Sequence, residues 1–246
     1  MELYFIRHGQ SQNNANWRKP AYQESPDPAL TEIGHEQACY VSQFLRERQT
    51  LTNQKSWNIQ NRMGFGLTHI YTSLMERAVH TAAPTAQALG ISFAAWEEIH
   101  ESGGIFGRDG GMSIQGLPGK SRAYFEQYFP ELCLPDHLNG SGWWNRPFET
   151  EEECHMRAKT FLADLLTRHG DRAGRPENRV AIFSHGGFFI HLMCAILDTP
   201  WRQGALGMQS AFVLNNCSIS RIDFDEDGIK FAYINRTDHL PDHLIT

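Results

Sequence analysis

The 246-residue sequence predicts an α/β fold, because short apolar segments of strand length alternate with longer segments of helical composition. The segment 3–6 is an uninterrupted apolar run, and the segment 179–183 is apolar after its first residue, Arg179. This composition is typical of strands in a parallel sheet, since both faces of such strands are covered by helices. We expect one α/β domain over residues 1–246, with insertions at about 50–66 and 103–148.

Periodicity and capping signals place the other elements. The capping box formed by Thr150 and Glu153 opens a helix, and Thr31 is the N-cap of another. Pro84 lies within a helical segment, where we expect a kink or a restart. Residues 103–119 are dense in glycine and are expected to form a loop. The predicted helices span about 31–48, 74–89, 121–129, 150–169 and 187–197. Further strands are expected at 69–71, 91–96 and in a hairpin over 218–234.

Composition excludes several classes of function. Lys and Arg number 22 against 28 Asp and Glu, so the net charge of −6 argues against a nucleic-acid or anionic-membrane surface. No apolar run approaches the ~18 residues of a membrane helix, and the segment 1–8 is too short and wrongly charged for a secretory signal. The five cysteines are odd in number and widely spread, which indicates reduced thiols and a cytoplasmic protein. No metal or cofactor is expected, because the histidines lack metal-ligand spacing.

Two predicted strands run directly into a histidine. The first strand is followed by Arg7 and His8, and the strand at 179–183 leads into His185 and Gly186. The carboxyl ends of parallel strands share one edge of a sheet, where ligands bind, so both imidazoles are expected in one crevice. Gly186 also opens a helix, whose free N–H groups suit an anion.

A third strand end supplies another cation. The strand at 69–71 leads through Thr72 and Ser73 to Arg77, in the first turn of a helix. The guanidinium fork of arginine matches two phosphate oxygens. Two arginines, two histidines and a helix N-terminus at one place predict a site for a phosphate dianion.

Four ordered motifs resemble the histidine phosphatase, or phosphoglycerate mutase-like, superfamily. Arg7-His8-Gly9-Gln10-Ser11-x-x-Asn14 is similar to the first histidine motif of that family, and the segment 184–187, Ser-His-Gly-Gly, matches its second. The segments 30–38 and 71–84 resemble two further family elements, Pro84 included. The likeness runs in family order from residue 5 to about 241 and leaves only the two insertions uncovered.

The resemblance implies a three-layer fold with a mostly parallel central sheet, and phosphoryl transfer through a phosphohistidine. His8 corresponds to the nucleophile. Arg7, Arg77 and His185 correspond to groups that hold the transferring phosphoryl oxygens. Asn14 is expected to hold the phosphate through its side-chain amide, and Gly186 through its backbone N–H.

The proton donor of the family is a carboxyl group after the helix that carries Arg77. Here this stretch is 97–104, Glu-Glu-Ile-His-Glu-Ser-Gly-Gly. We assign Glu101, which precedes the glycines, and keep Glu98 as the alternative. Trp143 and Trp144 are expected to be the hydrophobic anchor of the second insertion.

Departures from the mutase motifs favour a phosphatase. Mutases of this family carry Asn-Arg-Phe-x-Gly-Trp after the first motif and Glu-Arg-x-Tyr-Gly at the acid, whereas this chain has Asn16-Trp17-Arg18-Lys19-Pro20 and Glu101-Ser102-Gly103-Gly104. The predicted function is hydrolysis of small phosphomonoesters, with 103–148 as a lid that sets substrate choice. The alternatives are phosphoglycerate mutase-type transfer and a non-catalytic module that binds phosphorylated ligands.

Overall fold

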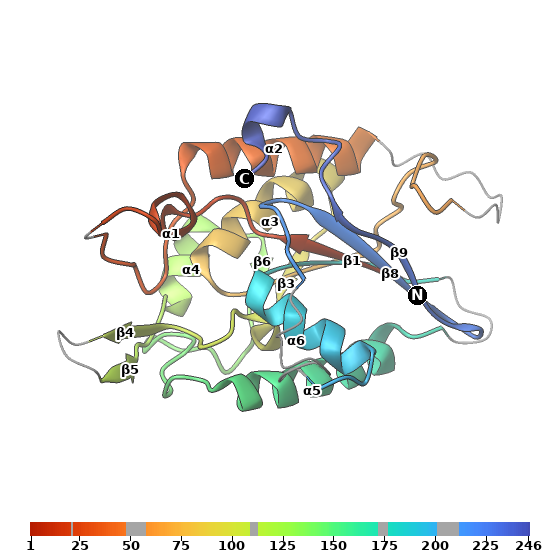
Figure 1. Ribbon diagram of the computed structural model, residues 1–246. Coiled ribbons are helices and arrows are strands. Elements are labelled where there is room, and N and C mark those ends of the chain that lie inside the picture. The colour runs from red at the N-terminus through yellow and green to blue at the C-terminus, as the bar shows by residue number, and fades with distance from the viewer. Residues whose placement is uncertain (21, 48–57, 109–112, 172–176, 201–211) are drawn as a thin grey trace.

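The computed structural model describes the chain except for residues 21, 48–57, 109–112, 172–176 and 201–211 (Figure 1). A seven-stranded sheet with the order β6-β3-β2-β7-β1-β8-β9 forms its centre. The first five of these strands run parallel, and β8 and β9 pair antiparallel. The strands are β1 (Glu2–Arg7), β2 (His69–Thr72), β3 (Phe93–Ala95), β6 (Leu132–Cys133), β7 (Arg179–Ser184), β8 (Ile219–Asp225) and β9 (Gly228–Arg236).

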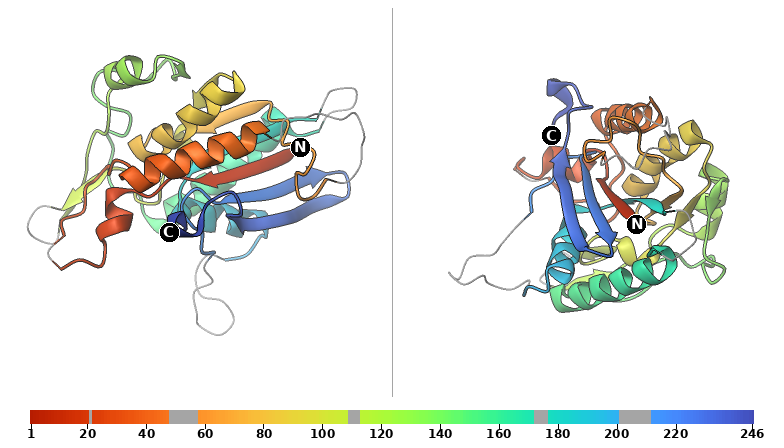
Figure 2. Two further views of the ribbon diagram at one scale, coloured as in Figure 1. Left: turned by 90° about the horizontal axis from the view of Figure 1, so that it is seen from above. Right: turned by 90° about the vertical axis from the view of Figure 1, so that its right-hand side faces the viewer.

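Helices cover both faces of the sheet, as the predicted three-layer arrangement requires. α2 (Glu32–Glu47) and α3 (Glu76–Leu89) lie on one face, and α5 (Glu151–His169) and α6 (Gly186–Ile196) lie on the other (Figures 1 and 2). Each pair of helices closes its own cluster of buried apolar side chains against the sheet. The mostly parallel α/β architecture predicted from the sequence is confirmed.

The register between β1 and β7 brings the two histidine motifs together. Arg7 pairs with Ser184 in parallel register, so the next residues, His8 and His185, leave the sheet side by side. The His8 N–H donates to the Ser184 carbonyl at 3.0 Å, which extends the ladder by one bond. β2 lies on the other side of β7, with Thr72 opposite Phe183, and delivers the segment that carries Arg77 to the same edge.

The predicted caps form as expected. The Thr31 hydroxyl accepts the Gly34 N–H at 3.1 Å, and Thr150 and Glu153 form the reciprocal capping box that starts α5. The expected restart at Pro84 is wrong, because α3 runs without interruption over Glu76–Leu89. A short helix, α1 (Gln12–Asn16), was not predicted from the sequence; it is only five residues long and depends on its Ser11 cap.

The expectation of a structureless loop over 103–119 is also wrong. β4 (Phe106–Arg108) and β5 (Ile114–Gly116) form an antiparallel hairpin in this segment. The predicted helix follows as α4 (Arg122–Tyr128), and β6 then joins the edge of the main sheet. Residues 50–57 of the other predicted insertion, 50–66, lie outside the described residues.

Trp143 and Trp144 anchor the second insertion. Both indoles are buried and pack against the His100 ring. Neither contributes to the cavity described below. Within the described part of the chain, no helix combines the length and apolarity needed to cross a membrane.

Candidate active site

A cavity of about 790 Å³ opens at the carboxyl ends of the parallel strands. Its wall combines the loop after β1, the segment 22–28, the first turn of α3 and the segment 101–108. Five of the predicted site residues line it: Arg7, His8, Asn14, Arg77 and Glu101. His185 and Gly186 are not among the lining residues, but His185 lies beside His8 and Gly186 lies beside Arg7.

His8 is held in a single tautomer. Its Nδ1 lies 2.7 Å from the carbonyl oxygen of Gly9, which can only accept, so Nδ1 carries the proton. The Arg77 Nε–H donates to His8 Nε2 at 3.2 Å, so Nε2 carries a lone pair. Burial, together with the charges of Arg77 and Arg7, holds the pKa of His8 well below its usual value. His8 is therefore a neutral imidazole whose unprotonated nitrogen borders the cavity.

Arg77 is a buried cation that pairs with a buried carboxylate. Its Nη1 lies 3.7 Å from a carboxylate oxygen of Asp27, and both side chains are 9 % exposed. Asp27 also accepts the N–H of Glu76, at the start of α3. Burial raises the pKa of Asp27 to about 6, although Arg77 opposes this shift. The Nε of Arg77 thus contacts His8, and its Nη1 lies near the Asp27 carboxylate.

Arg7 adds a second cation to the site. One of its terminal nitrogens donates to the Leu214 carbonyl. Its Nε is buried and has no partner within the described residues. A Cβ placed on Gly186 would lie 3.6 Å from this Nε, so the first residue of α6 is its neighbour. A buried guanidinium with an unused N–H suits an anionic ligand.

The His185 ring lies beside the His8 ring. Their centroids are 5.1 Å apart, and His185 is fully buried. His185 Nε2 lies 2.9 Å from the Ser73 hydroxyl, whereas Nδ1 has no partner among the residues that the structure describes. Burial and the charge of Arg77 lower the pKa of His185 well below its usual value. The His185 imidazole is thereby oriented by Ser73, the residue that follows β2.

Asn14 is fixed through its side-chain oxygen. Oδ1 accepts the Ser11 N–H at 3.2 Å and the Asn216 Nδ2–H at 3.2 Å. Asn216 donates to the His8 carbonyl as well, at 2.9 Å. With Oδ1 occupied, the Asn14 amide N–H groups remain to serve the cavity that this residue lines.

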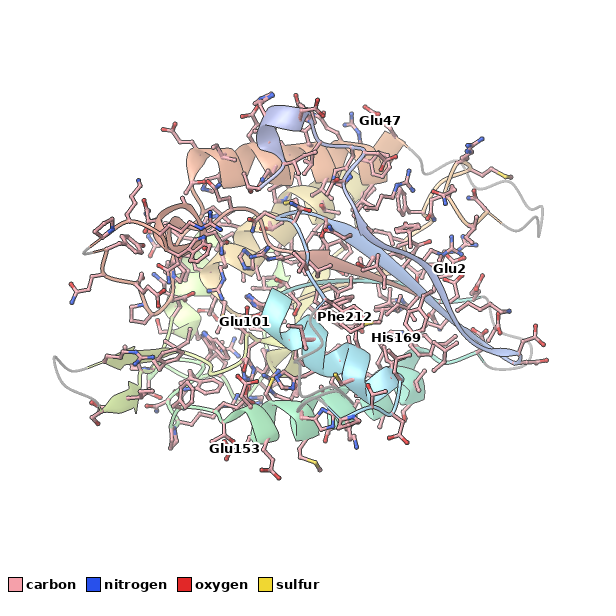
Figure 3. All side chains as sticks on the ribbon, viewed as in Figure 1. Glu2, Glu47, Glu101, Glu153, His169 and Phe212 are labelled. Atoms are coloured by element: carbon pink, nitrogen blue, oxygen red, sulfur yellow. The ribbon has the colours of Figure 1, made fainter. Side chains whose placement is uncertain are left out.

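Glu101 lies beside the first turn of α6 (Figure 3). Its Oε1 accepts the Phe188 N–H at 2.9 Å and the Ser102 N–H at 3.0 Å. Glu98, the alternative proton donor, is not among the described residues that line the cavity. The geometry therefore favours Glu101 over Glu98.

Backbone packing fixes the loop that carries His8. Gly9 and Gly34 are so close that a Cβ on Gly9 would overlap the Gly34 carbonyl oxygen. The Gly9 N–H donates to the Thr81 hydroxyl at 3.0 Å, and Gln37 accepts the next N–H, that of Gln10, at 2.7 Å. The predicted helices at 31–48 and 74–89 thus supply the side chains that hold the loop still.

Sequence reasoning missed Asp27 and gave no role to Ser73 or Asn216. Ser73 was visible in the sequence as part of the strand-end segment that leads to Arg77. Asp27 lies in Ser-Pro-Asp-Pro, a turn-like segment in which nothing signals a buried carboxylate. Among the described residues, no group of three or more His, Cys, Asp or Glu side chains is placed to hold a metal ion.

The family model of the histidine phosphatase superfamily (branch 1) matches residues 3–56 and 59–237. Proteins named probable phosphoglycerate mutase GpmB, from Salmonella arizonae and Salmonella enteritidis, are 28 % identical over 229 residues, which is 92 % of this chain and 86 % of theirs.

Solved structures agree at the level of the fold. A mycobacterial glucosyl-3-phosphoglycerate phosphatase in complex with VO3 superimposes with a TM-score of 0.61 at 19 % identity, covering 96 % of this chain and 99 % of that one. Phosphoserine phosphatase from Entamoeba histolytica, bound to 3-phosphoglyceric acid, gives 0.57 at 18 % identity, covering 98 % of this chain and 99 % of that one.

Fold and site together define an α/β enzyme with a paired-histidine centre. The chain belongs to branch 1 of the histidine phosphatase superfamily, and its activity is that of a phosphatase or a mutase.

Proposed function

We propose that this protein hydrolyses small phosphomonoesters through a phosphohistidine on His8. The observation that carries the proposal is the unprotonated Nε2 of His8, at the cavity wall and 3.2 Å from the Nε of Arg77. A neutral imidazole nitrogen among fixed cations is an activated nucleophile beside a charge clamp.

The first step transfers the phosphoryl group to the enzyme. His8 Nε2 attacks phosphorus, the N–P bond forms, and the ester P–O bond breaks. Arg7, Arg77 and His185 bind the equatorial oxygens, and Asn14 and the Gly186 N–H complete the contacts. Glu101 donates a proton to the leaving alkoxide.

The second step returns the enzyme to its starting state. Water attacks phosphorus, the N–P bond breaks, and Glu101, now a carboxylate, accepts the proton from that water. Inorganic phosphate then leaves with its oxygens released from the two arginines. The fixed cations Arg7 and Arg77 offset the phosphoryl charge, which supports a reaction that needs no metal.

Hydrolysis is favoured over mutase transfer by the departures from the mutase motifs after residue 14 and at Glu101. In the second insertion, Phe106, Gly107 and Arg108 line the cavity and belong to a hairpin outside the main sheet. We assign substrate choice to this insertion, as part of a single domain.

The five cysteines are all free, which suits a cytoplasmic protein.

Mutase transfer is the second candidate, because the relatives similar in sequence are named probable phosphoglycerate mutases. A panel of phosphorylated metabolites, including 2- and 3-phosphoglycerate, separates the two by whether inorganic phosphate or the isomer is formed. Turnover that survives a chelator, is blocked by vanadate and is lost in His8→Ala supports the phosphatase. Isomerisation with negligible phosphate release establishes the mutase, and no turnover of any ester establishes a non-catalytic binding module.

A further inference from the structure

The residues of a buried ion pair bind the chain on both sides of Glu101. Arg157, on α5, forms a bidentate pair with Glu149, with both N–O distances at 2.6 Å. The two side chains are 10 % and 9 % exposed. Neither residue lines the cavity or figures in the proposed chemistry.

The guanidinium also binds the chain immediately before Glu101. Arg157 Nη1 donates to the carbonyl oxygens of Glu98 and His100, the latter at 3.1 Å. The carbonyl between them, that of Ile99, accepts the Ser184 hydroxyl at 2.7 Å. All three carbonyls that lead into Glu101 are therefore fixed by side chains from α5 and β7.

The acidic partner, Glu149, binds the chain after Glu101 through its backbone. The backbone N–H of Glu149 donates to the Gly103 carbonyl at 3.2 Å, and Gly104 donates to the Glu101 carbonyl at 3.0 Å. Arg157 further lies over the Phe188 ring, 4.9 Å from its centroid. Phe188 is the residue whose N–H binds the Glu101 carboxylate.

The pair stays charged over the working range of pH. Burial alone would raise the pKa of Glu149, but the Arg157 and His100 contacts outweigh it and lower the pKa to about 2. His100 is a neutral neighbour, because burial lowers its pKa to about 4. Loss of one partner would leave the other as a buried, unpaired charge.

We infer that Arg157, through its pair with Glu149, is a positioning residue that sets the place of the Glu101 carboxyl relative to the leaving group. The inference rests on the proposed role of Glu101 as proton donor. Small misplacements of such a group are costly, since proton transfer requires hydrogen-bond distance to the leaving oxygen.

The test uses leaving groups that differ in their need for a proton. 4-Nitrophenyl phosphate releases a stabilised phenolate, whereas glycerol phosphate releases an alkoxide that must be protonated. For Arg157→Lys we expect kcat/KM, which reports the first transfer step, to fall by about 10- to 30-fold on glycerol phosphate and by less than about threefold on 4-nitrophenyl phosphate. Glu101→Gln should show the same selectivity with a larger loss.

A double variant separates positioning from a general loss of structure. If Arg157 acts through Glu101, adding Arg157→Lys to Glu101→Gln lowers kcat/KM on glycerol phosphate by less than about a further twofold. The matched control is Arg122→Lys, because Arg122 also binds two backbone carbonyls in the second insertion but does not contact the Glu101 segment. It should lower kcat/KM on both substrates equally or not at all.

Equal losses on both substrates, or losses that multiply in the double variant, overturn the inference while leaving the role of Glu101 intact. An unselective Glu101→Gln overturns the proton-donor assignment, and this inference with it. Should Arg157→Lys fail to fold, Glu149→Gln carries the same expectation, because it loosens the guanidinium while keeping the shape of the side chain.

Discussion

The Nε–H of Arg77 donates to Nε2 of His8 at 3.2 Å, while Nδ1 of the same imidazole is hydrogen-bonded to the Gly9 carbonyl. These two contacts fix both the tautomer and the direction of the lone pair. The same guanidinium is therefore placed next to any group that bonds to Nε2. One pair of residues thus prepares the nucleophile and places a cation beside the phosphoryl group it would receive.

Replacement of Arg77 tests this double role. Arg77→Lys keeps the charge but loses the planar fork and the Nε–H that faces His8. We expect kcat to fall by about 100-fold or more, the typical cost of losing one charge-stabilising donor. Steady-state kinetics on 4-nitrophenyl phosphate measure it. A variant with near-normal kcat and only a raised KM would contradict a role in the reaction itself.

Protonation of Asp27 should account for part of the pH dependence of the activity. Its pKa of about 6 lies well above the ordinary value because the carboxyl is buried, with Arg77, Glu76 and Lys120 as the charged neighbours. As the pH falls through 6 the carboxylate gains a proton and its hold on Arg77 weakens. We expect kcat/KM to fall below about pH 6 in the natural protein.

Asp27→Asn should resemble the acid form at every pH. Its kcat/KM at pH 8 is expected to be about tenfold lower, with a shallower fall below pH 6. Comparing the two proteins on one substrate cancels the ionisation of the substrate. Parallel pH profiles would rule out Asp27 as the titrating group.

Gly187 offers a steric test of Glu101. A Cβ on Gly187 would overlap the Glu101 carboxylate oxygen, which is the mobile end of a side chain. Gly187→Ala should therefore displace the carboxyl with little effect on folding, and lower kcat on glycerol phosphate by about 10- to 100-fold. Gly140→Ala is the control, since nothing lies within 4 Å of its Cβ. Equal activity in the two variants would show that the position of this carboxyl is unimportant.

Buried neutral imidazoles should make the fold sensitive to acid. The pKa values of His8, His185 and His100 are lowered in the folded chain, that of His100 to about 4. The unfolded chain binds these protons near pH 6.5 and the folded chain only at lower pH, so stability falls as the pH decreases from about 6.5.

The expected loss is up to ~1.4 kcal/mol per pH unit for each imidazole between about pH 6 and pH 4.5. Asp27 opposes it, because its raised pKa costs stability mainly above pH 6. Urea unfolding at pH 7 and pH 5 measures the difference, which His100→Asn should reduce. Equal free energies of unfolding at the two pH values would contradict the neutral assignment of these rings.

The central sheet and the convergence of the site were predictable because they depend on local signals. The apolar run at 3–6 and the run at 179–183 identify the strands, and the rule for parallel strand ends brings His8 and His185 together. The capping box at Thr150 was equally local. Each of these features depends on a few residues that are adjacent in the sequence.

The second insertion was not predictable in the same way. Its glycines suggested a loop, yet Gly116 lies in a strand, where a Cβ would overlap the backbone of Arg146, and Gly104 packs against the Trp144 ring. These glycines mark close packing with partners some 30 to 40 positions away, which no local pattern reveals. The same holds for Asp27, which pairs with Arg77, and for the bonds that Arg157 makes to the carbonyls of Glu98 and His100.

Trapping the covalent intermediate tests the central claim most directly. The protein is mixed with a phosphate-labelled substrate, quenched within the first turnover and digested to locate the label. We expect an acid-labile, alkali-stable phosphoryl group on the peptide that contains His8, and none in His8→Asn. Turnover by the natural protein with no labelled intermediate, or with the label on another residue, would contradict the account.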